Sequence, residues 1–320
     1  MNNAHTLRSR SVSSRFVLTT SAIALVVLFA STAVFASSYQ GQFEKTLQVS
    51  GPVDLEVLTR SGDVTVRAGS GGSVFIRGKI HVGDHWLFGG GRDTDVHQIE
   101  QNPPIRQDGN RIHIEYVDMR NISIDYEISV PADTTIRSHS GSGDQIIEGT
   151  HGNVDTQTGS GDVKLAKLTG EIHLQTGSGN IRAREIAGPV RGGTGSGDVE
   201  IEEAAAGDID LHTGSGNITA RGVQGGFRGE TGSGDVTAEG TQSGSWEIHT
   251  GSGNVHVRLP ANAAFDADIS TSSGSVDVAE PIEMTVQGRV GDSHKQIHGK
   301  VHGGGPLLRV RTGSGDIHIQ

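Results

Sequence analysis

Acidic residues that follow a repeated Gly-Ser-Gly sequence are the first candidates for chemistry in this chain. Carboxylate oxygens are preferred ligands of Ca²⁺, and Gly- and Asp-rich turns bind Ca²⁺ in nonapeptide β-rolls. Here the acid follows glycine directly and alternates with asparagine, so the spacing typical of those rolls is absent. We interpret these residues as turn residues, and a calcium-binding β-roll is the lowest-ranked alternative. They are Asp144, Asp162, Asn180, Asp198, Asn217, Asp235, Asn254 and Asp316.

Two groups of histidines have the side chains needed to ligate zinc or copper. The first group is His212, Glu230 and His249, and the second is His294, His298 and His302. Members of the first group share one position of a repeat, so strand spacing would hold its two imidazoles ~9.6 Å apart, too far for one ion. The second group has helical spacing, but Gly299 and the glycines at 303–305 disfavour a helix. We therefore assign no metal site and no cofactor.

Acidic and basic residues also alternate along the chain, which invites a catalytic interpretation. Polysaccharide-active β-helices set such residues side by side on one sheet face, and Arg221 and Glu239 are the pair to test. The same residues belong to series whose simpler role is mutual neutralisation. One series is Arg184, Glu202, Arg221, Glu239 and Arg258, and the other is Arg191, Asp210, Arg228 and Glu247. We expect no enzyme, with a polysaccharide-active β-helix enzyme as the alternative.

Composition excludes several classes of protein. The 320 residues include 48 Gly, 8 Pro and no Cys, so a disulfide framework is impossible, and glycine has no three-residue period that would indicate collagen. Each glycine inside a helix costs about 1 kcal/mol relative to alanine, which disfavours long helices. The formal net charge of -11 makes nucleic acid an unfavourable partner.

The Thr-Gly-Ser-Gly sequence recurs at a fixed interval, which indicates stacked supersecondary units. Successive copies between Ser140 and Thr250 are 18 or 19 residues apart. Within each unit, two short runs of alternating apolar residues are separated by glycine, as in 163–165 and 172–174. We predict an all-β fold, a single-stranded parallel β-solenoid (β-helix or β-roll) with 18–19 residues per coil and a right-handed winding.

Stacking in register would bring equivalent residues of successive coils into columns. One inward column alternates large and small residues, namely Leu174, Gly192, Leu211, Gly229 and Ile248. Another is β-branched throughout, namely Val163, Ile181, Val199, Ile218, Val236 and Val255. Period-two parity points Thr176 inward, which disfavours an ice-binding threonine array. These alternations make the true unit a coil pair of 36 to 37 residues.

The corner sequence has a backbone explanation. We expect the glycines on both sides of serine to supply positive φ values. We also expect the Asp or Asn side chain to bond its own backbone two residues further on. Because neighbouring carboxylates at ~4.8 Å repel by ~0.9 kcal/mol in water, the interposed asparagines should relieve the column.

The first 36 residues have the layout of an export signal. Arg8, Arg10 and Arg15 precede an uncharged run from Phe16 to Ala36, which predicts a hydrophobic targeting helix. Cleavage would make it a signal peptide; without cleavage, residues 16–36 would anchor the chain in a membrane. In both cases residues 37–320 would lie outside the cytoplasm.

The repeat divides the chain into four segments. They are 1–36, the signal peptide or N-terminal membrane anchor; 37–137, degenerate β-repeats with an insertion loop at 81–110; 138–259, the regular solenoid; and 260–320, irregular coils that end in a last Thr-Gly-Ser-Gly-Asp repeat. Within the insertion, Trp86, Leu87 and Phe88 are candidates for covering an end or flank of the stack.

Three sequence features carry a resemblance to a known family. They are Leu58-Thr-Arg-Ser-Gly-Asp-Val64, Tyr126-Glu-Ile-Ser-Val-Pro-Ala132 ahead of Ser140-Gly-Ser-Gly-Asp144, and the closing Gly303-Gly-Gly305 to Asp316. With the repeats, residues 44–320 resemble the "putative adhesin" family of bacterial envelope proteins, a β-strand-repeat domain of unknown function. The resemblance implies no catalytic residues.

From these observations we predict a non-catalytic, exported scaffold or recognition surface at the bacterial cell envelope. It would be periplasmic, at the cell surface or membrane-anchored, and its partner would be an envelope protein or a glycan.

Overall fold

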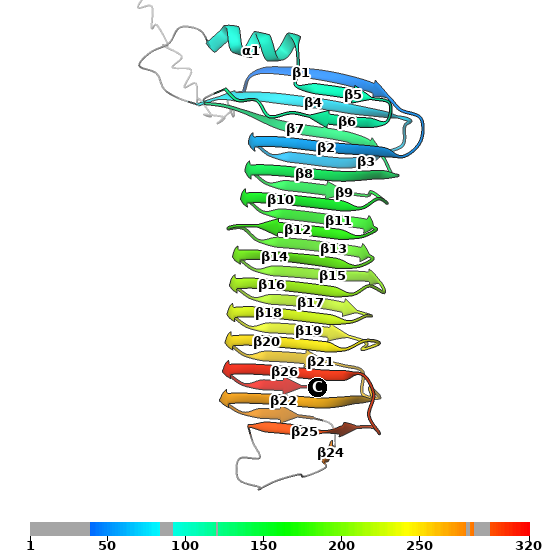
Figure 1. The fold of residues 1–320 in the computed structure, drawn as a ribbon, viewed down its shortest axis with the longest axis vertical. Helices are drawn as coiled ribbons and strands as arrows, with labels where there is room; N and C mark the ends of the chain where they lie inside the picture. The colour runs from blue at the N-terminus through cyan, green and yellow to red at the C-terminus, as the bar shows by residue number, and fades with distance from the viewer. Residues whose placement is uncertain (1–38, 84–91, 120, 280–281, 285–294) are drawn as a thin grey trace, which may run out of the picture. The chain divides into compact units, whose positions relative to one another are not determined.

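The computed structural model describes residues 39–83, 92–119, 121–279, 282–284 and 295–320 (Figure 1). The predicted targeting helix at 1–36, the aromatic cluster at 86–88 and His294 lie outside these residues. Contacts between Cα atoms divide the chain into two units, residues 1–37 and 38–320. All the described residues belong to the second unit. None of the helices in the described ranges has the length and apolar character needed to cross a membrane.

The strands of the described residues form two long sheets (Figure 1). In spatial order the first sheet contains β1 (Tyr39–Gln48), β4 (Ser73–Val82), β7 (Ile122–Pro131), β3 (Val64–Gly69), β9 (Gln145–Glu148), β11 (Val163–Thr169), β13 (Ile181–Ala187), β15 (Val199–Ala205), β17 (Ile218–Val223), β19 (Val236–Gly240), β21 (Val255–Arg258), β27 (Ile317–Ile319) and β23 (Val276–Val278). The second sheet contains β24 (Ile282–Met284), β25 (Gln296–Val301), β22 (Phe265–Ser273), β26 (Leu307–Ser314), β20 (Trp246–Ser252), β18 (Phe227–Ser233), β16 (Ile209–Ser215), β14 (Val190–Ser196), β12 (Ile172–Thr176), β10 (Val154–Ser160), β8 (Thr134–Ser142), β2 (Val53–Ser61), β6 (Arg111–Ile114) and β5 (Ile105–Asp108).

Each regular coil gives one strand to each sheet, and equivalent strands pair in parallel, which confirms the predicted parallel β-solenoid. The register aligns Leu174 with Gly192 and Gly192 with Leu211, so the predicted large-and-small column is present. The predicted β-branched column is also in register and fully buried. The core is therefore a thin layer between two sheets, filled by alternate residues of every strand.

The threonine of each corner points inward, as parity predicted. Thr176 is 3% exposed, and its hydroxyl donates a 3.0 Å hydrogen bond to the carbonyl of Gly161 in the preceding coil. The same bond, at 2.9–3.2 Å, recurs from Thr158 to Thr312. A small hydroxyl therefore satisfies a backbone carbonyl that a buried apolar residue would leave without a partner.

The glycines before the serines serve a different purpose from the one predicted. None of these first glycines lies in the left-handed region among the described corners, so positive φ does not explain them. A Cβ at Gly177 would instead lie 2.5 Å from the carbonyl oxygen of Gly159 in the neighbouring coil. The second glycine does reach positive φ at some corners, such as Gly253 at 156°. Close stacking of corners, more than turn geometry, therefore requires glycine.

The region predicted as an insertion loop at 81–110 contains regular structure. Its middle forms helix α1 (Arg92–Gln101), and β5 follows as an antiparallel partner of β6. Val96 and Ile99 of α1 are buried, and α1 packs against edge strand β1. The sequence hid this helix because only these two apolar residues mark its inner face. Helix α1 thus lies on β1, the outermost strand at this end of the first sheet, whereas the covering role predicted for Trp86, Leu87 and Phe88 falls outside the described residues.

The chain order of the C-terminal coils also differs from the prediction. The last coil, β26–β27, is inserted between β20–β21 and β22–β23 (Figure 1). Thr312 therefore aligns with Thr250, and Thr271 aligns with Thr312. Antiparallel strands β25 and β24 then continue the second sheet beyond β22. Strands β22 to β25 thus form the outer layers, and β26 and β27 lie beneath them.

Candidate functional site

The acidic corner residues form a hydrogen-bonded ladder along the stack. The Asp162 Oδ1 atom accepts a 2.9 Å hydrogen bond from the backbone N–H of Asn180, the equivalent residue of the next coil. This bond, at 2.7–3.0 Å, repeats from Asp125 to Ser275. The predicted bond to the residue's own backbone was wrong, because parallel stacking places the next coil's N–H closer. The corner carboxylates are therefore used in holding one coil to the next.

Charge along this ladder is relieved in two ways. Asn180 and Asn217 each donate a side-chain N–H to the aspartate below, at 3.3 and 3.2 Å. Four aspartates adjoin at the start of the ladder, Asp125, Asp63, Asp144 and Asp162, and the ammonium group of Lys164 lies 3.2 and 3.8 Å from the last two. Hydrogen bonds from the backbone and hydroxyl of Ser275 lower the pKa of Asp316. The ladder is thus a column of Asp and Asn side chains, several of which have a further partner beside the backbone N–H.

The two histidine groups are placed in different surroundings. The first group, His212, Glu230 and His249, does share one outward column. The Glu230 carboxylate forms an ion pair with Arg228 of its own strand, at 2.7 Å. In the second group, His298 lies on strand β25, 3.1 Å from Asp268, so the spacing does not mark a helix. Within the described residues, no group of three or more potential ligands is arranged to hold a metal ion.

The charged series pair partly along the predicted columns and partly on the diagonal. Arg221 is in register with Glu202 and Glu239, yet its guanidinium lies 3.0 Å from Glu200. Arg184 also pairs with Glu200, at 3.8 Å, because the register shifts between β13 and β15. The second series continues beyond Glu247 to Arg309, at 3.2 Å, which sequence order concealed. Both series are exposed ion-pair networks.

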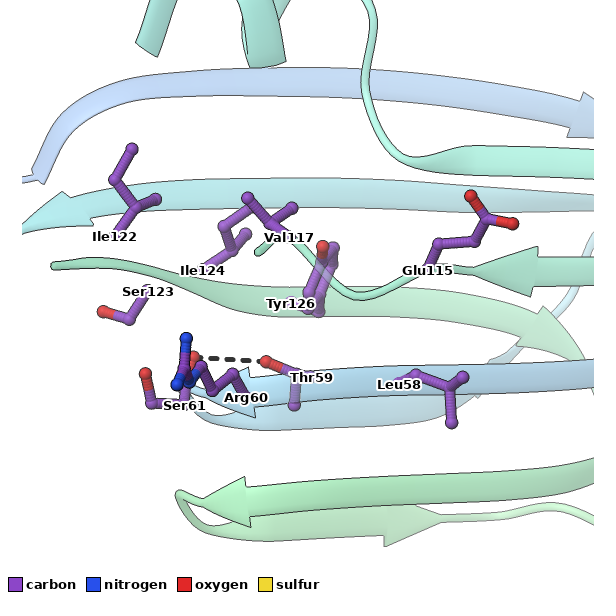
Figure 2. A pocket seen from close by; sticks show the side chains of 10 residues that line it. All are labelled: Leu58, Thr59, Arg60, Ser61, Glu115, Val117, Ile122, Ser123, Ile124 and Tyr126. Atoms are coloured by element: carbon purple, nitrogen blue, oxygen red, sulfur yellow. Dashed lines mark hydrogen bonds between the residues drawn. The ribbon is translucent and has the colours of Figure 1, made fainter. Parts of the chain in front are cut away.

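A small cavity lies where the first coil meets the N-terminal strands (Figure 2). Its lining comes from β2, from β7 and from the segment that follows β6, and includes Arg60, Glu115 and Tyr126. The cavity volume is about 10 Å³, which is room for about one water molecule. Burial raises the pKa of the Tyr126 hydroxyl, so this group stays protonated at physiological pH. The cavity is too small for a substrate.

Larger and more open depressions lie on the outward faces. One, of about 430 Å³, lies on the second sheet beside His139, Gln157 and Gln175. Another, of about 280 Å³, lies on the first sheet beside His256 and His318, whose rings stack 5.3 Å apart. Sequence reasoning missed both, although period-two parity already placed these residues outward.

Glu203 is a buried acid in an apolar column. It aligns with Ile186 across a register shift and is only 7% exposed. Its Oε2 atom accepts a 2.8 Å hydrogen bond from the backbone N–H of Gln224, whereas Oε1 has no partner among the described residues. Burial raises the pKa of Glu203 to about 7. The sequence contained a signal for this buried acid. Glu203, the second residue of a Glu-Glu pair, occupies the repeat position where preceding coils have the buried residues Leu168 and Ile186.

Comparisons with known proteins match nearly the whole chain. A model of the Toastrack DUF4097 family matches residues 37–188 and 190–320. Among solved structures, the chain is similar to a "putative adhesin" from Bacteroides fragilis, at 13% identity, TM-score 0.40, and 89% and 99% coverage of this chain and that one. It is also similar to a "putative cell adhesion protein" from Clostridium sporogenes, at 13% identity, TM-score 0.22, and 87% and 97% coverage. No curated protein matches. The resemblance inferred from the sequence is confirmed.

Proposed function

The chain belongs to the Toastrack DUF4097 family, a domain of unknown function, and from this premise we propose that it is a non-catalytic recognition scaffold of the bacterial cell envelope. Its outward sheet faces would present side chains to an envelope protein or glycan. Residues 1–36 would direct export, with 37–320 outside the cytoplasm and the coil wound right-handed. Without cleavage, residues 16–36 would hold the scaffold at the membrane.

One observation carries this proposal: the coils are fixed to one another at every corner. The Asp/Asn ladder and the threonine hydroxyls repeat one hydrogen bond each per coil. Side chains on the outward faces therefore keep constant positions along the stack, which lowers the entropy lost when a partner binds. Some of the charged outward residues are also paired with one another, as Arg258 and Glu239 are at 3.3 Å, which restricts their side chains.

Cross-linking in intact cells tests the proposal. Full-length protein would carry a photoreactive amino acid at His173 on the second sheet or at Glu202 on the first, both exposed. Gln98 on helix α1 is the matched exposed control. We expect one sheet face to capture a discrete envelope component that the control position does not capture.

Two outcomes would contradict the proposal. One is that neither face captures an envelope component above the level of the control. The other is specific turnover of an envelope glycan by the purified protein. If turnover depended on Arg221 and Glu239 while their double substitution left the fold intact, the enzyme alternative would replace the scaffold.

A further inference from the structure

The first glycines of the corners lie in a row along the second sheet, and a depression of about 430 Å³ lies beside two of them, Gly159 and Gly177. The first glycine of each corner has no room for a side chain, because a Cβ there would lie 2.5–2.6 Å from a backbone carbonyl oxygen of the neighbouring coil. We call this row the glycine row. Its members are Gly141, Gly159, Gly177, Gly195, Gly214, Gly232, Gly251 and Gly313. Close stacking thus excludes a side chain at every position of this row.

One outward column runs beside the glycine row along its length. In register it contains His139, Gln157, Gln175, Gly193, His212, Glu230, His249 and Arg311. The ring of His212 lies over Gly193, where even a Cβ would clash with it. This ring divides the column into an uncharged part, before Gly193, and a part with Glu230 and Arg311 after it. We call the uncharged part, His139, Gln157 and Gln175, the amide segment.

The amide segment borders the depression of about 430 Å³, a volume within the usual range for ligand sites. No carboxylate, ammonium or guanidinium group lines it. The side chain of Gln175 is exposed, whereas the Nε2 atom of His139 is buried and has no hydrogen-bond partner in the described part of the chain. The Gln157 amide donates only a long hydrogen bond, 3.3 Å, to Asp155. Donors and acceptors are therefore available without any net charge.

Several classes of partner fit this surface poorly. A nucleic acid or another polyanion needs cationic side chains, which are absent from the lining of the depression. A peptide that adds a strand needs an open sheet edge, but β8, β10 and β12 are paired on both sides. A folded protein is anchored through buried apolar or aromatic groups, and none lines the depression. A neutral ligand rich in hydroxyl groups remains.

We propose that the amide segment beside the glycine row binds a neutral polysaccharide that lies parallel to the solenoid axis. The segment repeats one polar side chain per coil, ~4.8 Å apart, so it suits a chain of repeating units better than a single small molecule. Side-chain amides both donate to and accept from sugar hydroxyls. This inference rests on the proposed recognition function and names its ligand class.

Affinity gel electrophoresis of the full chain tests the site. The neutral probes are laminarin, xylan and mannan, and the acidic probe is polygalacturonate. We expect at least one neutral polysaccharide to retard the protein. The Gln157→Ala/Gln175→Ala variant should weaken that binding at least about tenfold, the loss of one or two hydrogen bonds. The matched control, His212→Ala/His249→Ala, changes the same column outside the amide segment and should bind like the unchanged protein.

Three results would overturn the inference: no retardation by any neutral probe, retardation by polygalacturonate alone, or equal binding by the amide variant and the unchanged protein. Circular dichroism of each variant checks that it is folded. The single Gln175→Glu variant adds a charge at nearly constant size and should also weaken binding. If the site fails while cells still yield a cross-linked envelope partner, the proposed function stands without this ligand.

Discussion

Each residue of the Thr-Gly-Ser-Gly-Asp corner satisfies a separate physical requirement. Threonine supplies a buried hydroxyl for a backbone carbonyl, and glycine allows two corners to approach closely. The aspartate or asparagine accepts the next coil's N–H, and the serine is exposed. A single substitution at a corner therefore disturbs the contact between two coils more than it disturbs the turn itself.

Glu203 makes stability depend on pH. Its pKa of about 7 in the folded chain, against an ordinary 4.5, means that the folded state binds more protons than the unfolded state between these values. The free energy of unfolding should therefore fall as pH rises from about 4.5 to 7 and then stay level. Glu203→Gln should remove this fall and stabilise the protein at pH 8 by about 1–3 kcal/mol. Urea denaturation from pH 4.5 to 8 measures both effects.

The exposed neighbour of this residue offers a control. Glu202→Gln removes the same charge on the outward face and should leave the pH dependence of unfolding in place. A Glu203→Gln variant that still loses stability between pH 4.5 and 7 to the same extent would refute the assignment to Glu203.

The asparagines of the ladder should protect it from its own charge. Asn217→Asp would place three carboxylates in succession, between Asp198 and Asp235, and would remove the 3.2 Å hydrogen bond that Asn217 donates. Each new neighbour pair adds ~0.9 kcal/mol of repulsion in water. We expect the variant to be less stable by about 1–2 kcal/mol at pH 7 and low salt. The loss should shrink at high salt, because ions screen the repulsion, and a loss independent of salt would contradict the charge explanation.

At the scale of elements, helix α1 is a cover for an edge strand. It packs on β1, and the Glu100 carboxylate accepts a 3.0 Å hydrogen bond from the backbone N–H of Gln42. Val96 is 4% exposed against β1. Val96→Asp would bury a charge there, so we expect α1 to detach and the amides of β1 to exchange faster with deuterium.

Detachment should also change how the protein associates. β1 is a ten-residue strand, and an uncovered edge of that length is a template for pairing with another chain. Light scattering should therefore show concentration-dependent association of Val96→Asp, whereas the exposed control Gln98→Asp should behave like the unchanged protein. Unaltered exchange in β1 of the variant would show that α1 does not cover this edge.

The regular elements were predictable because the period fixes which residues meet. Two parts were not. Thr271 follows Thr250 in the sequence, and although its corner, Thr-Ser-Ser-Gly-Ser, departs from the repeat, nothing local shows that the Thr312 corner stacks between the two. The amide segment was not predicted because only the charged part of its column, from His212 onward, was considered as a candidate site. The alternation of inward and outward residues along each strand predicts that these side chains point outward. The depression beside them depends on the three-dimensional arrangement of neighbouring coils, which the sequence does not show directly.

At the scale of the whole molecule, the repeating unit is the coil pair. Deleting residues 194–230 removes one pair and preserves every alternation: Arg184 would meet Glu239, and Gly192 would meet Ile248. Deleting 194–212 removes one coil and would set Arg184 beside Arg221 and Gly192 beside Gly229. The two adjacent arginines repel, and the two adjacent glycines leave a void in the core. We therefore expect the one-coil deletion to be markedly less stable than the coil-pair deletion, although it removes fewer residues. Thermal unfolding compares the two variants, and equal stability would refute a pair-based register.

The inserted position of the last coil limits how such a protein can grow. Gln320 is hydrogen-bonded to Val257, and the strand that precedes it, β27, lies between β21 and β23. Extra repeats appended after Gln320 would find no open platform to build on. A designed lengthening would therefore add coil pairs inside the regular stack, between residues 138 and 259. A reporter fused to this terminus would emerge from the flank.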